Sequence, residues 1–70
     1  MYYLRSDVAA DELHLTLATA RESLGRLIKI KRTEPGVTVT VDDRGVWTFA
    51  SEQLGRVSVW ITDETQIYPL

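Results

Sequence analysis

The feature that most constrains the fold is an alternation of valine and threonine that breaks at a short polar turn and then resumes. Val37, Val39 and Val41 alternate with threonines, and the same alternation returns over residues 46–50, after the turn at residues 42–45. A period of two places successive side chains on opposite faces of a β-strand. Two such runs joined by a turn that contains aspartate and glycine predict a β-hairpin.

The length of the turn decides which residues pair across this hairpin. A three-residue loop that ends at Gly45, in the left-handed conformation, pairs Val41 with Trp47. The next pair on the same face is then Val39 with Phe49, so the large apolar side chains share one face. A loop of four residues would divide them between the two faces, and we therefore predict the three-residue loop.

A third strand is expected after a connector at residues 51–56 that contains Gly55. Val57, Val59 and Ile61 alternate with polar residues and extend the same apolar face. The second half of the chain is therefore expected to form an antiparallel meander.

Before the hairpin, the chain predicts a strand and then a helix. Residues 2–4 form a short β-prone run, and Ser6 or Asp7 supplies the side-chain oxygen that caps a helix beginning near Val8. Apolar residues then recur at steps of four, three and four, as on the buried face of an amphipathic helix. They are Leu13, Leu17, Ala20 and Leu24.

Residues 26–32 admit two interpretations. Two isoleucines alternate with Lys29 and Lys31, which favours a strand. The preceding helix would then end at Gly25, because glycine is the usual residue of a left-handed helix cap. In the alternative, the helix continues through this glycine to about Arg32.

Together these elements predict an α+β fold in which one helix packs on one face of an antiparallel sheet. The expected order is a strand, the helix and a meander of three or four strands, a β-α-β(3-4) arrangement within a single domain at residues 1–70. Proline and glycine in residues 34–37 predict a turn before the meander. The opposite sheet face is expected to be open. The expected core comprises Leu4, Leu13, Leu17, Leu24, Ile28, Ile30, Val37, Val39, Val41, Trp47, Phe49, Val57, Val59 and Ile61.

Composition and spacing argue against several kinds of chemistry. The chain has no cysteine and one histidine, and its eight basic and ten acidic residues give a formal net charge of −2. His14 has no orienting carboxylate or nucleophile in any sequence pattern, while Asp42 and Asp43 stand in a turn that favours aspartate for local hydrogen bonds. We therefore predict no catalytic residue, metal site or cofactor, and no enzyme. The lack of a signal-peptide pattern and of a long apolar run predicts a cytoplasmic protein without a membrane partner.

The open sheet face is the expected site of partner binding. Strand alternation places Trp60 on it, where the indole either anchors a partner or is covered by the tail at residues 65–70. A strand at residues 26–32 would point Lys29 and Lys31 to the same face. The candidate partner-binding residues are Trp60, Lys29, Lys31, Arg32, Thr40 and Thr48.

These observations favour a protein–protein interaction module that inhibits or modulates a larger complex. The alternative is a nucleic-acid-binding or transcription-regulating accessory protein, in which the basic residues contact phosphates and Trp60 stacks on a base. A net charge of −2 and the single aromatic residue on the open face disfavour it. A third function is a homo-oligomer in which the open face pairs with a second copy.

Tyr2-Tyr3-Leu4, the helix to Leu24 and the meander from Val37 to Thr62 form the outline of the chain. In size and outline the chain resembles small phage-encoded anti-CRISPR proteins and other host-takeover inhibitors. The resemblance lies in the outline and not in a motif, so it transfers no site residue. It implies steric blocking of a CRISPR effector complex or nuclease.

Overall fold

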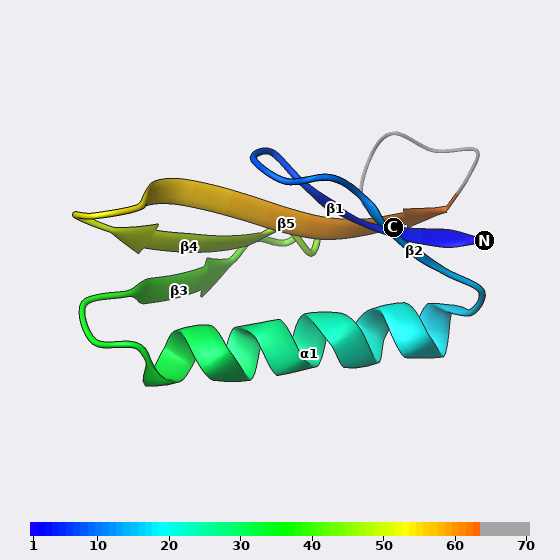
Figure 1. Cartoon of the computed structure of the whole chain (residues 1–70), viewed down its shortest axis with the longest axis horizontal. Helices are drawn as coiled ribbons and strands as arrows, with labels where there is room; N and C mark the ends of the chain where they lie inside the picture. Colours follow the sequence, from blue (N-terminus) through cyan, green and yellow to red (C-terminus); the bar gives the residue numbers. More distant parts are fainter. Residues whose placement is uncertain (64–70) are drawn as a thin grey trace.

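Residues 1–63, the part of the chain that this computed structural model describes, form a helix and a five-stranded sheet in two layers (Figure 1). The elements are β1 (Tyr2–Ser6), β2 (Glu12–His14), α1 (Leu17–Thr33), β3 (Thr38–Val41), β4 (Trp47–Ser51) and β5 (Gly55–Asp63). The strands lie in the order β2-β1-β5-β4-β3, and all neighbouring pairs are antiparallel. The predicted α+β fold, with a helix packed on an antiparallel sheet, is confirmed. The element order differs, because β2 precedes the helix.

The hairpin formed by β3 and β4 has the predicted register. Val41 pairs with Trp47, and Val39 pairs with Phe49. Gly45 ends the loop with a positive φ of 83°, as a left-handed residue does. The apolar alternation and the loop length were therefore sufficient to predict this part of the sheet.

Asp42 stabilises the turn through its backbone and its side chain. Its N–H donates to the Val46 carbonyl at 3.1 Å, and its carboxylate accepts from the N–H groups of Val46 and Arg44 at 3.0 and 2.9 Å. These hydrogen bonds lower the pKa of the Asp42 carboxyl below its usual value, and the hydrogen bond from the Val46 N–H contributes most. The interpretation of Asp42 as a turn residue is confirmed.

β5 lies at the centre of the sheet, between β4 and β1. The apolar face continues across it, since Phe49 of β4 pairs with Val57 of β5. The turn between these two strands is tighter than the loose connector predicted: Ser51 already pairs with Gly55, and the Leu54 N–H donates to the Ser51 hydroxyl at 2.9 Å. This turn brings an apolar side chain, that of Leu54, to the end of the sheet.

The helix α1 begins at Leu17, and the predicted start near Val8 is wrong. Thr16 is the N-cap, and its hydroxyl accepts a hydrogen bond from the Thr19 N–H at 3.2 Å. The residues before it form β2 and satisfy their backbone groups by pairing with β1. Leu13 therefore lies on the open sheet face, 54% exposed, and its predicted place in the core is wrong.

The two residues expected to cap the helix make other contacts. The Ser6 hydroxyl accepts from the Val8 N–H at 3.2 Å, which closes a local turn. The Asp7 carboxylate accepts from the Ser58 N–H at 3.0 Å, and the Asp7 N–H donates to the Ser58 carbonyl at 3.2 Å. Both residues thus hold the loop between β1 and β2, and Asp7 fastens it to β5.

Gly25 lies inside α1 and does not end it. The helix continues to Thr33, so the predicted strand at residues 26–32 is wrong and the alternative of a continuous helix is confirmed. The chain leaves the helix at its C-cap, Glu34. Gly36 has a φ of 78°, which confirms the turn predicted before the meander.

The buried stripe of α1 explains why the helix prevails over the strand. Ala20, Leu24 and Ile28 follow one another at steps of four and are the buried residues of the helix. Ile28 therefore continues the apolar stripe toward the sheet. Ile30 falls outside this stripe and is 56% exposed, so its predicted place in the core is wrong.

The core lies between α1 and the sheet. Trp47, which was predicted to be buried there, is half-buried, and the Arg32 guanidinium lies over its ring, 5.7 Å from the centroid. Val41 is 50% exposed because β3 is an edge strand, and its predicted burial is wrong. The buried cluster comprises Leu4, Leu24, Ile28, Phe49 and Val59, with Leu27, Val37, Val39, Trp47, Val57 and Ile61 packed partly against it. Leu17 is half-buried.

Two glycine substitutions test this description of the helix and its end. Gly25→Ala is expected to raise the free energy of unfolding by about 0.5–1 kcal/mol, because alanine is favoured in helix interiors and a Cβ there meets no atom within 4 Å. Gly36→Ala is expected to lower it by about 1–2 kcal/mol, because a side chain is strained at a φ of +78°. Urea unfolding measures both changes. A destabilising Gly25→Ala would contradict the continuous helix.

Candidate interaction site

The six residues predicted to bind a partner do not share one surface. Trp60, Thr40 and Thr48 lie on the open face of the sheet, as their alternation predicted. Lys29 and Lys31 belong to α1, which covers the opposite face, so their predicted place beside Trp60 is wrong. The other residue of the six is Arg32, which contacts Trp47 from the helix.

Trp60 is less accessible than a free anchor would be. It lies opposite Arg5 of β1 and is half-buried, and its indole Nε1 is buried without a hydrogen-bond partner in the described part of the chain. Arg5 is itself engaged: its Nε donates to the Thr62 hydroxyl at 2.8 Å, and its guanidinium lies over the Tyr3 ring at 5.2 Å. The tail expected to cover Trp60 lies outside the described residues.

An apolar concave surface lies between α1 and the end of the sheet near the β4–β5 turn. Two cavities of about 230 and 250 Å³ adjoin there and share Val8, Lys31, Phe49 and Val57 as lining residues. We call them together the apolar groove, and define it by Val8, Leu27, Lys31, Phe49, Leu54 and Val57. It is built by three segments: the β1–β2 loop, the second half of α1, and strands β4 and β5 with the turn between them.

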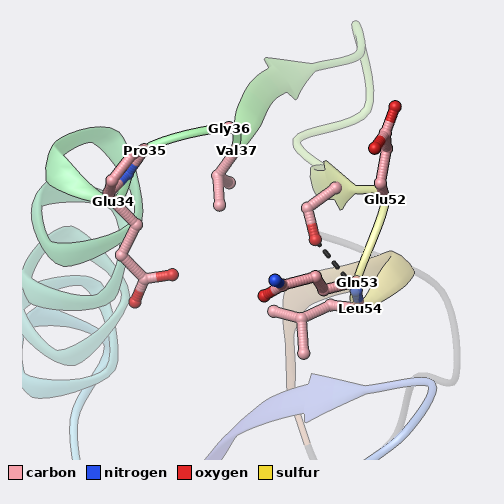
Figure 2. A pocket seen from close by; sticks show the side chains of 8 residues that line it. Glu34, Pro35, Gly36, Val37, Glu52, Gln53 and Leu54 are labelled. Carbon is pink, nitrogen blue, oxygen red and sulfur yellow. Dashed lines mark hydrogen bonds between the residues drawn. The ribbon is translucent and has the colours of Figure 1, made fainter.

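A third, more polar hollow continues the groove at one end, and its volume is about 380 Å³ (Figure 2). Glu34 and Val37 lie on one side of it, and Gln53 and Leu54 lie on the other. Val37 and Leu54 also line the neighbouring cavity, so the two spaces are continuous.

The groove combines exposed apolar rims with an ion pair at its wall. Val8 is 66% and Leu54 is 61% exposed, and they stand on either side of a floor that includes Phe49. The Lys31 Nζ lies 3.4 Å from the Glu34 carboxylate, and its side chain is 23% exposed. Such a surface can bind an apolar side chain.

Val8 and Leu54 were not among the residues predicted to bind. Val8 was assigned to a helix that does not form there, and Leu54 to a loose connector. One signal in the sequence was usable: Leu54 is an isolated large apolar residue within the polar run at residues 51–56. The facing partner, Val8, depends on the tertiary contact of the β1–β2 loop with β5 and has no local signal.

His14 has the carboxylate neighbour that its sequence context did not predict. The His14 Nε2 lies 2.5 Å from the Glu12 carboxylate, and the Ser23 hydroxyl donates to the same carboxylate oxygen at 2.6 Å. The His14 Nδ1 lies 3.2 Å from the Thr19 hydroxyl, which itself donates to the Thr16 carbonyl at 3.0 Å. The Thr19 proton is therefore directed to the backbone and not to the imidazole. This cluster ties β2 to the first turns of α1.

The same cluster gives a pH-dependent prediction. The Ser23 hydroxyl and then His14 lower the pKa of the Glu12 carboxyl, so the ionised form is favoured in the folded state. The resulting stabilisation is present above the ordinary pKa of glutamate and is lost as the pH falls through the lowered value. Glu12→Gln is expected to lower the urea midpoint at pH 7 and to lower it less at about pH 3, below the ordinary glutamate pKa, where part or all of the stabilisation has been lost. Glu22→Gln, on the exposed side of α1, is the control. An equal effect of Glu12→Gln at both pH values would contradict this role.

Within residues 1–63, no group of three or more histidine, aspartate or glutamate side chains is arranged to hold a metal ion. None of the helices described is long and apolar enough to span a membrane. Comparison with protein-family models, with curated proteins and with solved structures found no match. The function of the protein is therefore inferred from the surfaces of this chain alone.

Proposed function

We propose that this protein is a non-enzymatic protein–protein interaction module that binds an apolar side chain of its partner in the apolar groove. The observation that carries this proposal is the exposure of Val8 and Leu54 on the rims of one apolar cavity. Single exposed apolar residues are ordinary on protein surfaces, but two that flank a common cavity form an anchor site.

The exposed rims of the groove favour a protein partner over a small ligand. A small-molecule site encloses most of the surface of its ligand, whereas Val8 and Leu54 on the rims of this groove are 66% and 61% exposed. An aliphatic or aromatic side chain fills such a space, while the main chain around it contacts the rims.

Nucleic-acid binding is the second candidate, and one observation favours it. Five of the eight basic residues lie in α1, which contains one acidic residue, Glu22. Arg21, Arg26, Lys29 and Arg32 are exposed along this helix. However, Trp60 lies on the other side of the sheet, so it cannot stack on a base while these residues contact the phosphates. A phosphate contact by Lys29 predicts that Lys29→Ala lowers the slope of log affinity against log salt by about 1.

The inhibitory role is the more specific part of the proposal. Following the resemblance to anti-CRISPR proteins, we propose that the module blocks a larger complex sterically, with a CRISPR effector or nuclease as the partner to test first. Steric inhibition predicts that target cleavage falls in proportion to the amount of protein added and stops at one equivalent. Inhibition by far less than one equivalent would instead indicate an enzymatic mode of action.

Differential capture from extracts of the host tests the groove. Val8→Asp places a carboxylate on the rim, and proteins captured by the immobilised parent are expected to be lost from this variant. Thr48→Asp, on the open sheet face, is the matched control and is expected to retain them. Loss with Thr48→Asp and retention with Val8→Asp would reverse the assignment in favour of the open face.

A further inference from the structure

The two edges of the sheet differ in their protection against pairing with another chain. β2 has three residues, includes Glu12 and follows Asp11, and short charged strands of this kind resist pairing. β3 is the other edge, and its sequence, Thr-Val-Thr-Val, contains neither charge nor proline. In the described part of the chain β3 pairs with β4 alone. β3 is therefore the unprotected edge.

The hairpin geometry shows which backbone groups this edge presents. The hydrogen bond from the Asp42 N–H to the Val46 carbonyl lies within the hairpin. Hydrogen bonds of an antiparallel pair involve alternate residues, so Thr40 and Thr38 also bond toward β4. Val39 and Val41 consequently point their N–H and C=O groups away from the sheet. Among residues 1–63, no hydrogen bond to these outward groups is formed.

We propose that β3 pairs with β3 of a second copy, so that an antiparallel homodimer continues the sheet across a two-fold axis. The side chains select the register. With Val39 opposite the partner's Val39, Val37 lies opposite the partner's Val41, and the valines of both copies share the helix-facing side. A register displaced by two residues in one direction places Val37 opposite the partner's Asp43, next to a carboxylate, and in the other direction it places Val41 opposite the partner's Pro35. The first register is therefore favoured.

The chosen register also matches polar side chains. On the open face Thr38 lies opposite the partner's Thr40, and threonine pairs are favourable across strands. Val41, which is 50% exposed in the single chain, becomes covered.

The dimer is expected to be weak, because one short edge buries less than the ~1,200 Å² of a typical stable interface. Analytical ultracentrifugation of the 8.0 kDa chain measures the dissociation constant of the dimer. Concentrations from about 5 μM to about 1 mM bracket a Kd of tens of micromolar. The mean mass of the parent is expected to rise toward that of a dimer. A parent that remains monomeric at the highest concentration would overturn the proposal.

Edge variants identify the strand that pairs. Val41→Pro removes an N–H that points away from the sheet and leaves the hydrogen bonds to β4 intact. Edge strands tolerate proline at such positions. The double substitution Thr38→Lys with Thr40→Lys places lysines opposite lysines and leaves the helix side unchanged. Each is expected to raise the dimer Kd at least tenfold, whereas Leu13→Lys, on β2, leaves it unchanged. An equal loss with Leu13→Lys would overturn the assignment to β3.

Disulfide formation tests the register, because the chain has no cysteine of its own. In the proposed register Thr38 and the partner's Thr40 form a non-hydrogen-bonded pair, in which the Cβ atoms lie closest, so the double substitution Thr38→Cys with Thr40→Cys brings sulfurs of the two copies within bonding range. Mild oxidation is expected to link this variant into a dimer and to leave Leu13→Cys monomeric, and the reverse result would overturn the register. Val8→Asp distinguishes this proposal from the groove, since it is expected to abolish capture without changing dimerisation.

Discussion

Phe49→Ala is expected to lower the free energy of unfolding by about 3–5 kcal/mol, the largest effect of any single substitution considered. Phe49 is 4% exposed and belongs to the buried cluster beneath α1. Small domains have a total stability of about 5 kcal/mol, so this variant is expected to be largely unfolded at 37 °C. Far-UV circular dichroism with urea unfolding measures the loss.

Trp47→Ala is the informative comparison for Phe49→Ala. Alternation alone predicts full burial of Trp47, but Trp47 is half-buried and its ring also contacts the Arg32 guanidinium. Trp47→Ala is therefore expected to lower the free energy of unfolding by roughly 2 kcal/mol, about half of the loss expected for Phe49→Ala. A larger loss with Trp47→Ala than with Phe49→Ala would show that the core is centred elsewhere.

Leu54→Asp is expected to weaken partner binding by about 2 kcal/mol or more, which corresponds to a roughly 30-fold higher Kd. Leu54 is 61% exposed, so the substitution is expected to leave the free energy of unfolding nearly unchanged. The loss has two causes: an apolar anchor no longer finds its contact, and a carboxylate enters the rim of an apolar cavity. Isothermal titration calorimetry against the captured partner measures it.

Two control variants separate these causes. Leu54→Ala tests the loss of the apolar contact, and Thr48→Asp tests a general effect of added charge. Leu54→Ala removes the contact without adding charge. It is expected to weaken binding by about 1 kcal/mol, at least half of the loss caused by Leu54→Asp. Thr48→Asp adds the same charge to the open sheet face and is expected to change the Kd little. If Thr48→Asp were the more damaging variant, the open face would be the binding site.

The parts of the fold that local chemistry determines were predictable from the sequence. The pairing of Val41 with Trp47 follows from alternation and from the left-handed glycine at position 45, and both are local properties. The open-face position of Trp60 follows from the same alternation. In these segments the turn residues and the apolar pattern favour one structure.

The region before α1 was not predictable in the same way. Leu13 fits a helical stripe that also contains Leu17, and no local rule excludes a helix there. β2 forms because β1 offers an edge on which it pairs, and Thr16 caps the helix better than an interior threonine would extend it. Pairing between distant segments thus overrides a local preference.

Residues 26–32 show the opposite difficulty, since the helix is longer than its glycine suggested. Alternation over four residues is too short to distinguish a strand from a helix, and Ile28 satisfies both patterns. The choice is made by the sheet, which offers Ile28 a buried place one turn beyond Leu24. The predicted basic surface beside Trp60 was lost with the strand, and Lys31 became part of the groove wall instead.

Partner binding in the apolar groove is tested most directly by nuclear magnetic resonance of the isotope-labelled protein titrated with its captured partner. Binding in the apolar groove predicts that the largest amide shift changes fall at Val8, Leu27, Lys31, Leu54 and Val57, on three separate segments of the chain. The amides of Thr40, Thr48 and Ser58 are then expected to change little. Changes confined to these open-face amides, with the groove unaffected, would contradict the proposed site.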